Sequence, residues 1–327
     1  MWLVFTLITV ALWGSAELFY KRGSHANEKY SHLKTAIFVG IVMGIHAIFV
    51  LLTQNIGFDP MNMIYYIPVS LCYIISMTCS YFGIRFIEES ISDPIENTSG
   101  AIVPILCALI LHQEIQPWSI VAIIVIVAGV LGVGFLENKG DTDRKKKLGK
   151  KLAIIAFAMP FCYALLDACG TFLDIYYLDM ETTFLVNVTE ETIENVANTC
   201  YELTFLFMAI VLFIFLLIKK VKLFAINDAD NALETNEEAV KLNVFQKIMV
   251  QKDKIIAAVC ETAGQLAYVF AISENGAIAS PIIGAGVVVT SLLLSRVVLK
   301  EKLTKLQYLF IILVLIGIII LSIVESD

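Results

Sequence analysis

Ten stretches of about 20 mostly apolar residues dominate this sequence, and each is long enough to cross the roughly 30 Å hydrocarbon core of a bilayer as a helix. Lipid offers no partner for backbone N–H and C=O groups, so a stretch that crosses it must satisfy them internally as an α-helix. The sequence therefore predicts an all-α integral membrane protein with ten transmembrane helices. The predicted spans are residues 2–20, 34–53, 63–87, 94–111, 118–136, 152–172, 200–218, 255–273, 281–299 and 305–323.

The composition agrees with a membrane protein, because 58% of the residues are hydrophobic and only 16% are charged. Soluble domains rarely combine so many apolar residues with so few charges. No basic segment precedes the first span, which is therefore predicted to be a retained helix rather than a signal peptide. The seven cysteines include no CxxC pair, and we interpret them as small reduced apolar residues.

Lysine and arginine are distributed unevenly between the predicted connections. All 23 of them fall in every second connection, while the other connections and both termini have none. The positive-inside rule then places the basic connections in the cytoplasm and both termini outside. We expect a multi-pass protein of the cell membrane.

Two segments share one layout, in which a proline follows a serine-containing turn and a glutamate comes twenty residues later, from Pro94 to Glu114 and from Pro281 to Glu301. Five spans per half would make the second copy enter the membrane from the opposite side, so the prediction is an inverted repeat. Two related halves in a membrane are typical of transporters. The predicted units are a first repeat at 1–137, a basic cytoplasmic linker at 138–151, and a second repeat at 152–324 with polar insertions at 174–199 and 221–253. The insertion at 174–199 is acidic, and both a solvated outer loop and a cation-attracting vestibule fit it.

Three carboxylates, Glu17, Asp167 and Glu261, fall well inside predicted spans. A charge at the bilayer centre costs about 2.5–3.5 kcal/mol or more, and no Lys or Arg lies comparably deep. These acids are therefore either protonated for part of a cycle or joined by a cation. Glu17 and Asp167 coincide when the first helices of the two halves are aligned. The alternatives are a pairing of Glu17 with Lys21 one turn later and ordinary interhelical bonds for Asp167 and Glu261.

Aromatic residues share the predicted faces of these acids. Trp13 aligns with Tyr163, and Gln265 and Tyr268 follow Glu261 at helical spacing. A stripe on the third span comprises Tyr66, Ser70, Tyr73, Met77 and Tyr81. Aromatic faces beside carboxylates suit an organic cation or a zwitterion. Ordinary interhelical packing and hydrogen bonding are the alternative interpretation of the stripe.

Two further polar residues receive structural interpretations. Asp93 as N-cap, Pro94 at the first helical position and Glu96 at the third predict a capped helix start. His46 is interpreted as a satisfied core histidine rather than a proton relay. The HExxH, GxSxG and Walker motifs are absent from the sequence, and no spacing favours metal ligands. We therefore expect neither an enzyme nor a cofactor, metal or nucleic-acid partner.

Trp13-Gly14-Ser15 in the first span, Leu299-Lys300-Glu301 after the ninth and Gly317 in the last resemble the drug/metabolite transporter superfamily, specifically its EamA-type ten-helix members. The resemblance implies that helices 1, 3, 4, 6, 8 and 9 line a cavity and that helices 5 and 10 serve packing or dimerisation, which leaves a homodimer open. Similar members carry amino acids, other metabolites or drugs, often as proton-driven exporters. Some similar members have both termini in the cytosol, which leaves the opposite orientation open.

Glu17 in its Ala16-Glu17 setting is similar to the first-helix glutamate of the small multidrug resistance proteins, where the resemblance implies proton exchange against cationic drugs. The phosphate-ester and nucleotide-sugar carriers of the superfamily use basic cavity residues, and none is visible in the predicted spans.

The predicted function is secondary active transport of a small cationic or zwitterionic metabolite or drug, with a proton and the lipid bilayer as further partners. A membrane-embedded sensor or scaffold that binds a ligand without moving it is the alternative, and a channel is a weaker one. The candidate substrate- and proton-binding residues are Trp13, Glu17, Tyr81, Tyr163, Asp167, Glu261, Gln265 and Tyr268.

Overall fold

The computed structural model describes residues 1–25, 28–86, 89–138, 150–224, 248–298 and 304–324. All the regular elements in these residues are helices, as expected. In chain order they are α1 (Trp2–Gly23), α2 (Ser31–Thr53), α3 (Met61–Tyr65), α4 (Ile67–Gly83), α5 (Glu89–Glu96), α6 (Ser99–Ile110), α7 (Pro117–Asn138), α9 (Lys150–Leu178), α10 (Ile193–Ile218), α13 (Lys252–Val298) and α14 (Lys305–Val324).

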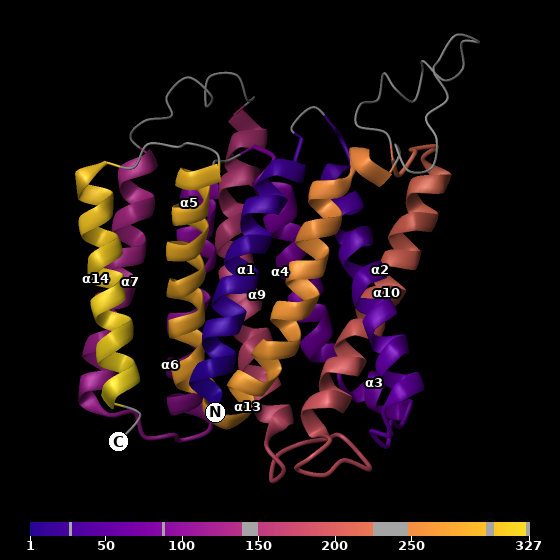
Figure 1. Cartoon of the computed structure of the whole chain (residues 1–327), viewed down its shortest axis with the longest axis horizontal. Helices are drawn as coiled ribbons and strands as arrows, with labels where there is room; N and C mark the ends of the chain where they lie inside the picture. Colours follow the sequence, from indigo (N-terminus) through magenta and orange to yellow (C-terminus); the bar gives the residue numbers. More distant parts are fainter. Residues whose placement is uncertain (26–27, 87–88, 139–149, 225–247, 299–303, 325–327) are drawn as a thin grey trace.

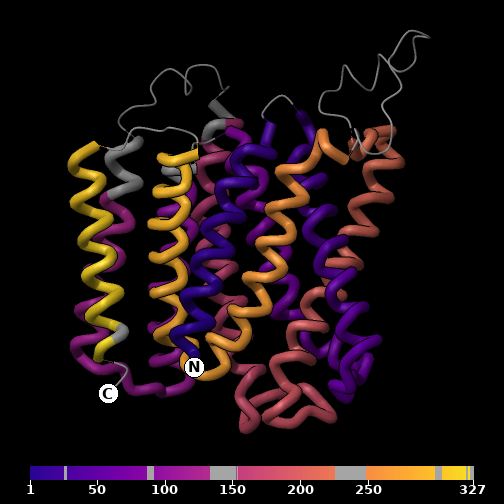
Figure 2. Tube along the Cα trace, viewed as in Figure 1, coloured from indigo at the N-terminus to yellow at the C-terminus, as the bar shows by residue number. Residues whose placement is uncertain are grey.

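The helices lie side by side in one layered bundle (Figures 1 and 2). The end where α1 and α4 finish and α2 and α13 begin is called the basic end below, because Lys21, Arg22 and Lys254 lie in the adjoining turns. Among the described residues, five helices are long and apolar enough to cross a membrane, namely α1, α2, α9, α10 and α13. Shorter apolar helices accompany them, and the count of ten crossings stays a prediction.

The long helix α13 is interrupted at Asn275, whose φ of −156° and ψ of 65° are not helical. Figure 1 shows the chain running away from the basic end, turning, and returning. The predicted spans 255–273 and 281–299 correspond to these two legs. An amide side chain and a following glycine, Gly276, make this a natural place for a helix to break.

A second interruption separates α5 from α6, and here the expected helix start at Pro94 is wrong. Pro94 lies inside α5, which ends at Glu96. The Ser92 hydroxyl donates a 2.7 Å bond to the Glu96 carboxylate one turn later, so the chain is already helical before the proline. The capping interpretation of Glu96 therefore fails, because this residue closes one helix instead of opening another.

The two interrupted segments are in direct contact. A Cβ added at Gly100 would lie 2.5 Å from the carbonyl oxygen of Ser280, and one added at Gly284 would lie 2.8 Å from that of Asn97. Neither distance can be accommodated, so glycine is required where α6 and the second leg of α13 cross. This crossing positions residues from both segments beside the same interior space.

The polar insertion predicted at 174–199 is shorter than expected. Helix α9 continues to Leu178 and α10 begins at Ile193, so the irregular segment covers only 179–192. Asp174 is a fully buried helical residue rather than part of an acidic loop. The helix continues because hydroxyl groups satisfy Asp174 and the neighbouring Ile175 and Tyr177 pack in the core. Most of the insertion predicted at 221–253 lies outside the described residues.

Candidate functional site

A cavity of about 60 Å³ lies between the helices of the bundle. Its walls come from α1, α4, α5, α6, α9, α10 and α13. All eight candidate residues line it: Trp13, Glu17, Tyr81, Tyr163, Asp167, Glu261, Gln265 and Tyr268. Residues from four separate helices, α1, α4, α9 and α13, thus face one space.

Glu261 stands at the end of a chain of hydroxyl groups. The Tyr20 hydroxyl donates to its Oε2 at 3.2 Å, and the Tyr81 hydroxyl donates to Tyr20 at 2.9 Å. The rings of Tyr20 and Tyr81 are 4.8 Å apart. Glu261 is only 7% exposed, so this chain supplies polar contacts that solvent cannot.

Trp13 forms an aromatic wall beside the same acid. Its Nε1 donates to the backbone carbonyl of Glu261 at 3.3 Å, and its ring lies 4.8 Å from that of Tyr268. Gly264 provides the room, because a Cβ there would collide with the indole ring. The indole is thereby fixed against the first leg of α13.

Asp167 faces the cavity from α9. Ser99, the first residue of α6, donates its hydroxyl to Asp167 Oδ2 at 2.7 Å. Tyr163 lies one turn earlier on the same helix and also lines the cavity. The interruption between α5 and α6 therefore places the Ser99 hydroxyl within hydrogen-bonding distance of the Asp167 carboxylate.

Three hydroxyl groups meet where α4, α9 and α13 converge. Tyr73 lies 2.8 Å from Tyr268 and 3.0 Å from Thr171, and the Tyr268 hydroxyl donates to Thr171 at 2.8 Å. We call these residues the hydroxyl triangle. All three line the cavity, so the tyrosine stripe of α4 takes part in a polar wall as well as in packing.

Sequence reasoning missed three buried acids. Glu96 was interpreted as a cap, yet it lines the cavity at 4% exposure. Asp174 was assigned to a loop. Glu202 on α10 is fully buried and lies 2.8 Å from Nδ1 of His46 on α2. The partner of His46 is thus an acid from a distant span, which helical periodicity within one span cannot reveal.

The described Asp, Glu, Lys, Arg and His side chains that line the cavity are all acidic. Four carboxylates line it, from Glu17, Glu96, Asp167 and Glu261, and the described lining residues include no Lys, Arg or His. Aromatic rings from Trp13 and several tyrosines complete the walls. This combination can bind an organic cation through charge and ring faces, and its carboxyl groups can take up and release protons.

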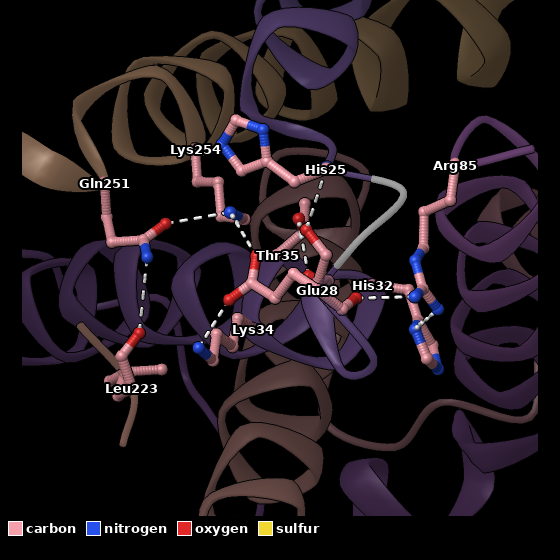
Figure 3. A network of polar contacts seen from close by, with 10 residues as sticks. His25, Glu28, His32, Lys34, Thr35, Arg85, Leu223, Gln251 and Lys254 are labelled. Carbon is pink, nitrogen blue, oxygen red and sulfur yellow. Dashed lines mark hydrogen bonds and ion pairs between the residues drawn. The ribbon is translucent and has the colours of Figure 1, made fainter. Parts of the chain in front are cut away.

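At the basic end, a second polar cluster lies outside this cavity (Figure 3). Glu28 forms ion pairs with Lys34 and with Lys254, the latter at 3.5 Å, and Lys254 also donates to Gln251 at 2.8 Å. Arg85 donates to the backbone carbonyl of Glu28 at 2.5 Å. The Glu28 cluster, as we call it, joins the α1–α2 connection, the end of α4 and the start of α13.

The side chains of the Glu28 cluster are deeply buried, with Lys34 and Lys254 each 1% exposed. Burial and the nearby Lys254 lower the pKa of His25, which lies just after α1. This imidazole is therefore kept neutral beside the lysines. The cluster ties three helix ends together at the basic end of the bundle.

Comparisons with known proteins agree with a membrane transporter. A model of the EamA-like transporter family matches residues 1–135 and 191–323, which is more than half of the chain. No curated protein matches. A crystal structure of a protein with 10% sequence identity superposes with a TM-score of 0.63 over 98% of this chain and 96% of that one. At that identity the likeness concerns the fold alone.

Proposed function

Because this chain belongs to the EamA-like transporter family, we propose that it is a secondary active transporter that exports a small cationic or zwitterionic metabolite or drug in exchange for protons. The family and the apolar helices point to transport across a membrane. The side chains that line the cavity support the proposed class of substrate. The observation that carries the proposal is the cavity with four carboxylates, several aromatic rings and no basic side chain among its described lining residues.

The chemistry is a competition for the same carboxyl groups. Glu17 and Asp167 alternately hold a proton and the cationic group of the substrate, so arrival of one releases the other. Glu261 and its tyrosines shape the binding space, and Trp13 and Tyr268 offer ring faces to the cation. An exchange of this kind moves substrate against its concentration gradient when protons move down their electrochemical gradient.

Alternating access requires the cavity to open to each side in turn, and two features support it. The Glu28 cluster joins helix ends at the basic end, where it can hold that side closed. At the crossing, Gly100 follows the interruption between α5 and α6, and Gly284 follows the interruption of α13 at Asn275. Asn97 and Gly284 occupy equivalent positions in the proposed inverted repeat, both three residues after the matched prolines, and they touch each other.

Flux measurements on proteoliposomes test this function. We would present amino acids, polyamines, guanidinium compounds and quaternary amines under a proton gradient, and record both proton and substrate movement. Wild type should give a saturable signal with at least one class. Glu17→Gln should abolish the coupled signal while inserting and folding normally, and Glu190→Gln, a change at an exposed acid of the 179–192 segment, should leave it intact.

The other outcomes are informative as well. Normal coupled transport by Glu17→Gln would remove that residue from the mechanism. Absence of flux together with ligand-induced thermal stabilisation would favour the sensor or scaffold. Flux that does not saturate would favour a channel. A cysteine introduced into the cavity should react from both faces of the membrane in a transporter, but not in a sensor or scaffold that binds the ligand without moving it.

A further inference from the structure

Four of the seven cysteines lie where α4 and α9 pack together. Cys72 and Cys79 are on α4, and Cys162 and Cys169 are on α9. The step from 72 to 79 equals the step from 162 to 169, and it is close to two turns of an α-helix. Each of the two helices therefore carries two thiols on one face, at the same spacing.

Two glycines show how α4 and α9 are aligned. A Cβ added at Gly170 would lie 3.2 Å from Cβ of Cys72, and one added at Gly83 would lie 3.4 Å from Cβ of Met159. The lower numbers of α4 thus contact the higher numbers of α9, so the two helices run antiparallel. In this alignment each of the two cysteines on α4 falls opposite one of the two cysteines on α9.

The two thiols of each pair are neighbours in space. Cys72 is close enough to Cys169 for the two thiols to interact electrostatically, and the same holds for Cys79 and Cys162. A disulfide needs Cβ atoms about 3.5–4.5 Å apart. Position 170, directly beside Cys169, is already as close as that to Cys72. Bridging the pair therefore requires no large movement of the backbone.

The four thiols lie on the outer side of this interface. Tyr73 and Ser80, each directly after a cysteine of α4, line the cavity, whereas none of the four cysteines does. The two thiols on α9 are exposed, and the two on α4 are half-buried. A small reagent can therefore reach them without entering the cavity.

We infer that these cysteines form two oxidisable pairs across α4 and α9, namely Cys72 with Cys169 and Cys79 with Cys162. Oxidation by a peroxide joins the two helices through disulfide bonds. One thiol gives up its proton and attacks a peroxide oxygen, so that it becomes a sulfenic acid and a first water leaves. The partner thiol attacks the sulfenic sulfur, the S–S bond forms and a second water leaves. The two thiols lose two electrons and two protons, which hydrogen peroxide takes up.

Such bonds would act on the candidate site, because α4 and α9 belong to different predicted repeats, 1–137 and 152–324. Both helices form cavity walls, α4 through Tyr73 and Ser80 and α9 through Asp167 and Thr171. Alternating access moves one repeat against the other, and a covalent link between them opposes that movement. This regulatory role rests on the proposed function, whereas the pairing of the thiols does not.

Oxidation of the full-length protein in lipid tests the pairs without any substrate. A specific protease site inserted at residue 145, in the basic linker, would let cleavage divide the chain between the two repeats. After treatment with hydrogen peroxide, the two parts should separate only when a reductant is added. Mass spectrometry should identify both expected pairs of joined peptides. Oxidised parts that separate without reductant, or cross-links confined to other cysteines, would overturn the proposal.

Cysteine variants identify the partners. Cys72→Ser should abolish the first cross-link and keep the second, and Cys79→Ser should do the reverse. Cys260→Ser, at a half-buried position on α13, is the matched control and should keep both. A first cross-link that persists in Cys72→Ser through another cysteine would show that the alignment is wrong. The peptide map of wild type decides the pairing even where a variant does not fold.

Flux measurements then test the regulatory role, with labelled spermidine, guanidinium and arginine each tested separately. Oxidation should reduce flux in proportion to the cross-linked fraction, and dithiothreitol should restore it. The double variant Cys72→Ser/Cys79→Ser should keep its flux in the presence of peroxide. Full flux through cross-linked protein would refute the regulatory role. If reduced wild type moves none of the probes, the proposed function fails for them, while the peptide map still decides the pairing.

Discussion

Tyr20 illustrates how one hydroxyl supports the candidate site. It receives a bond from Tyr81 and gives one to Glu261, so its oxygen links α1, α4 and α13. The side chain is 3% exposed and its ring packs on that of Tyr81. Loss of this oxygen would remove the bond that Tyr81 donates and the bond that Glu261 accepts.

Tyr20→Phe is therefore expected to destabilise the protein by about 1–3 kcal/mol, the usual cost of leaving buried polar groups unsatisfied. Thermal unfolding in lipid nanodiscs would measure the change. Tyr65→Phe, at a 39% exposed position, provides the matched control and should unfold like wild type. Equal unfolding of both variants would show that the Tyr20 bonds contribute nothing to stability.

The candidate residues could be predicted because each is a polar or aromatic side chain at helical spacing inside an apolar run. Glu17, Asp167 and Glu261 are conspicuous for that reason, and their location in one cavity is consistent with a shared role, which stays a prediction. Glu96 was not predicted to line the cavity, because Asp93 and Pro94 before it resemble the start of a helix. The pairing of His46 with Glu202 depends on which spans are adjacent, and a single sequence does not contain that information.

At the scale of elements, the Glu28 cluster determines how three helix ends meet. Two buried lysines share one carboxylate, and Arg85 holds the same residue through its backbone. Removing one member of a buried ion pair is costly, because the remaining charge keeps its desolvation penalty without compensation. The stability of this junction therefore depends on Glu28 more than on any one of its partners.

Glu28→Gln should lower the free energy of unfolding by about 3–5 kcal/mol, since Lys34 and Lys254 lose their common counterion. Asp253→Asn removes the partner of Arg22 in a more exposed pair 3.3 Å apart, for which about 0–1 kcal/mol is expected. Denaturation followed by tryptophan fluorescence in lipid nanodiscs compares the two. Similar losses for both variants would show that the cluster is no stronger than a surface pair.

At the scale of the whole molecule, the alternation of apolar runs was sufficient to predict an all-helical membrane protein. Most predicted spans agree with the described helices to within a few residues. The exceptions are the span predicted at 94–111, which is divided into α5 and α6, and the span predicted at 63–87, which is divided into α3 and α4. In addition, α9 and α10 both extend into the insertion predicted at 174–199. Such breaks depend on what packs against them, as at Gly100 and Ser280, and local sequence determines them only weakly.

Orientation in the membrane gives a prediction at this scale. Figure 1 places the first and last described helical turns at the end opposite the basic one. If the positive-inside rule holds, a C-terminal reporter that is active only in the cytoplasm should be silent, and the same reporter inserted at residue 145 in the basic linker should be active. A bright C-terminal fusion would reverse the orientation.

The crossing of α6 with the second leg of α13 has a mechanical consequence. Backbone lies against backbone there, because glycine leaves no side chain that could change rotamer and absorb a change in spacing. Two helices in such contact can rotate relative to each other, but they cannot separate without losing the contact. In the proposed transport cycle, a small rotation about this contact would displace the far ends of the two helices more than the contact itself. Spin labels on either side of the crossing should keep their separation, while labels at the far ends of α6 and of the second leg of α13 should change theirs when substrate or a proton gradient is added.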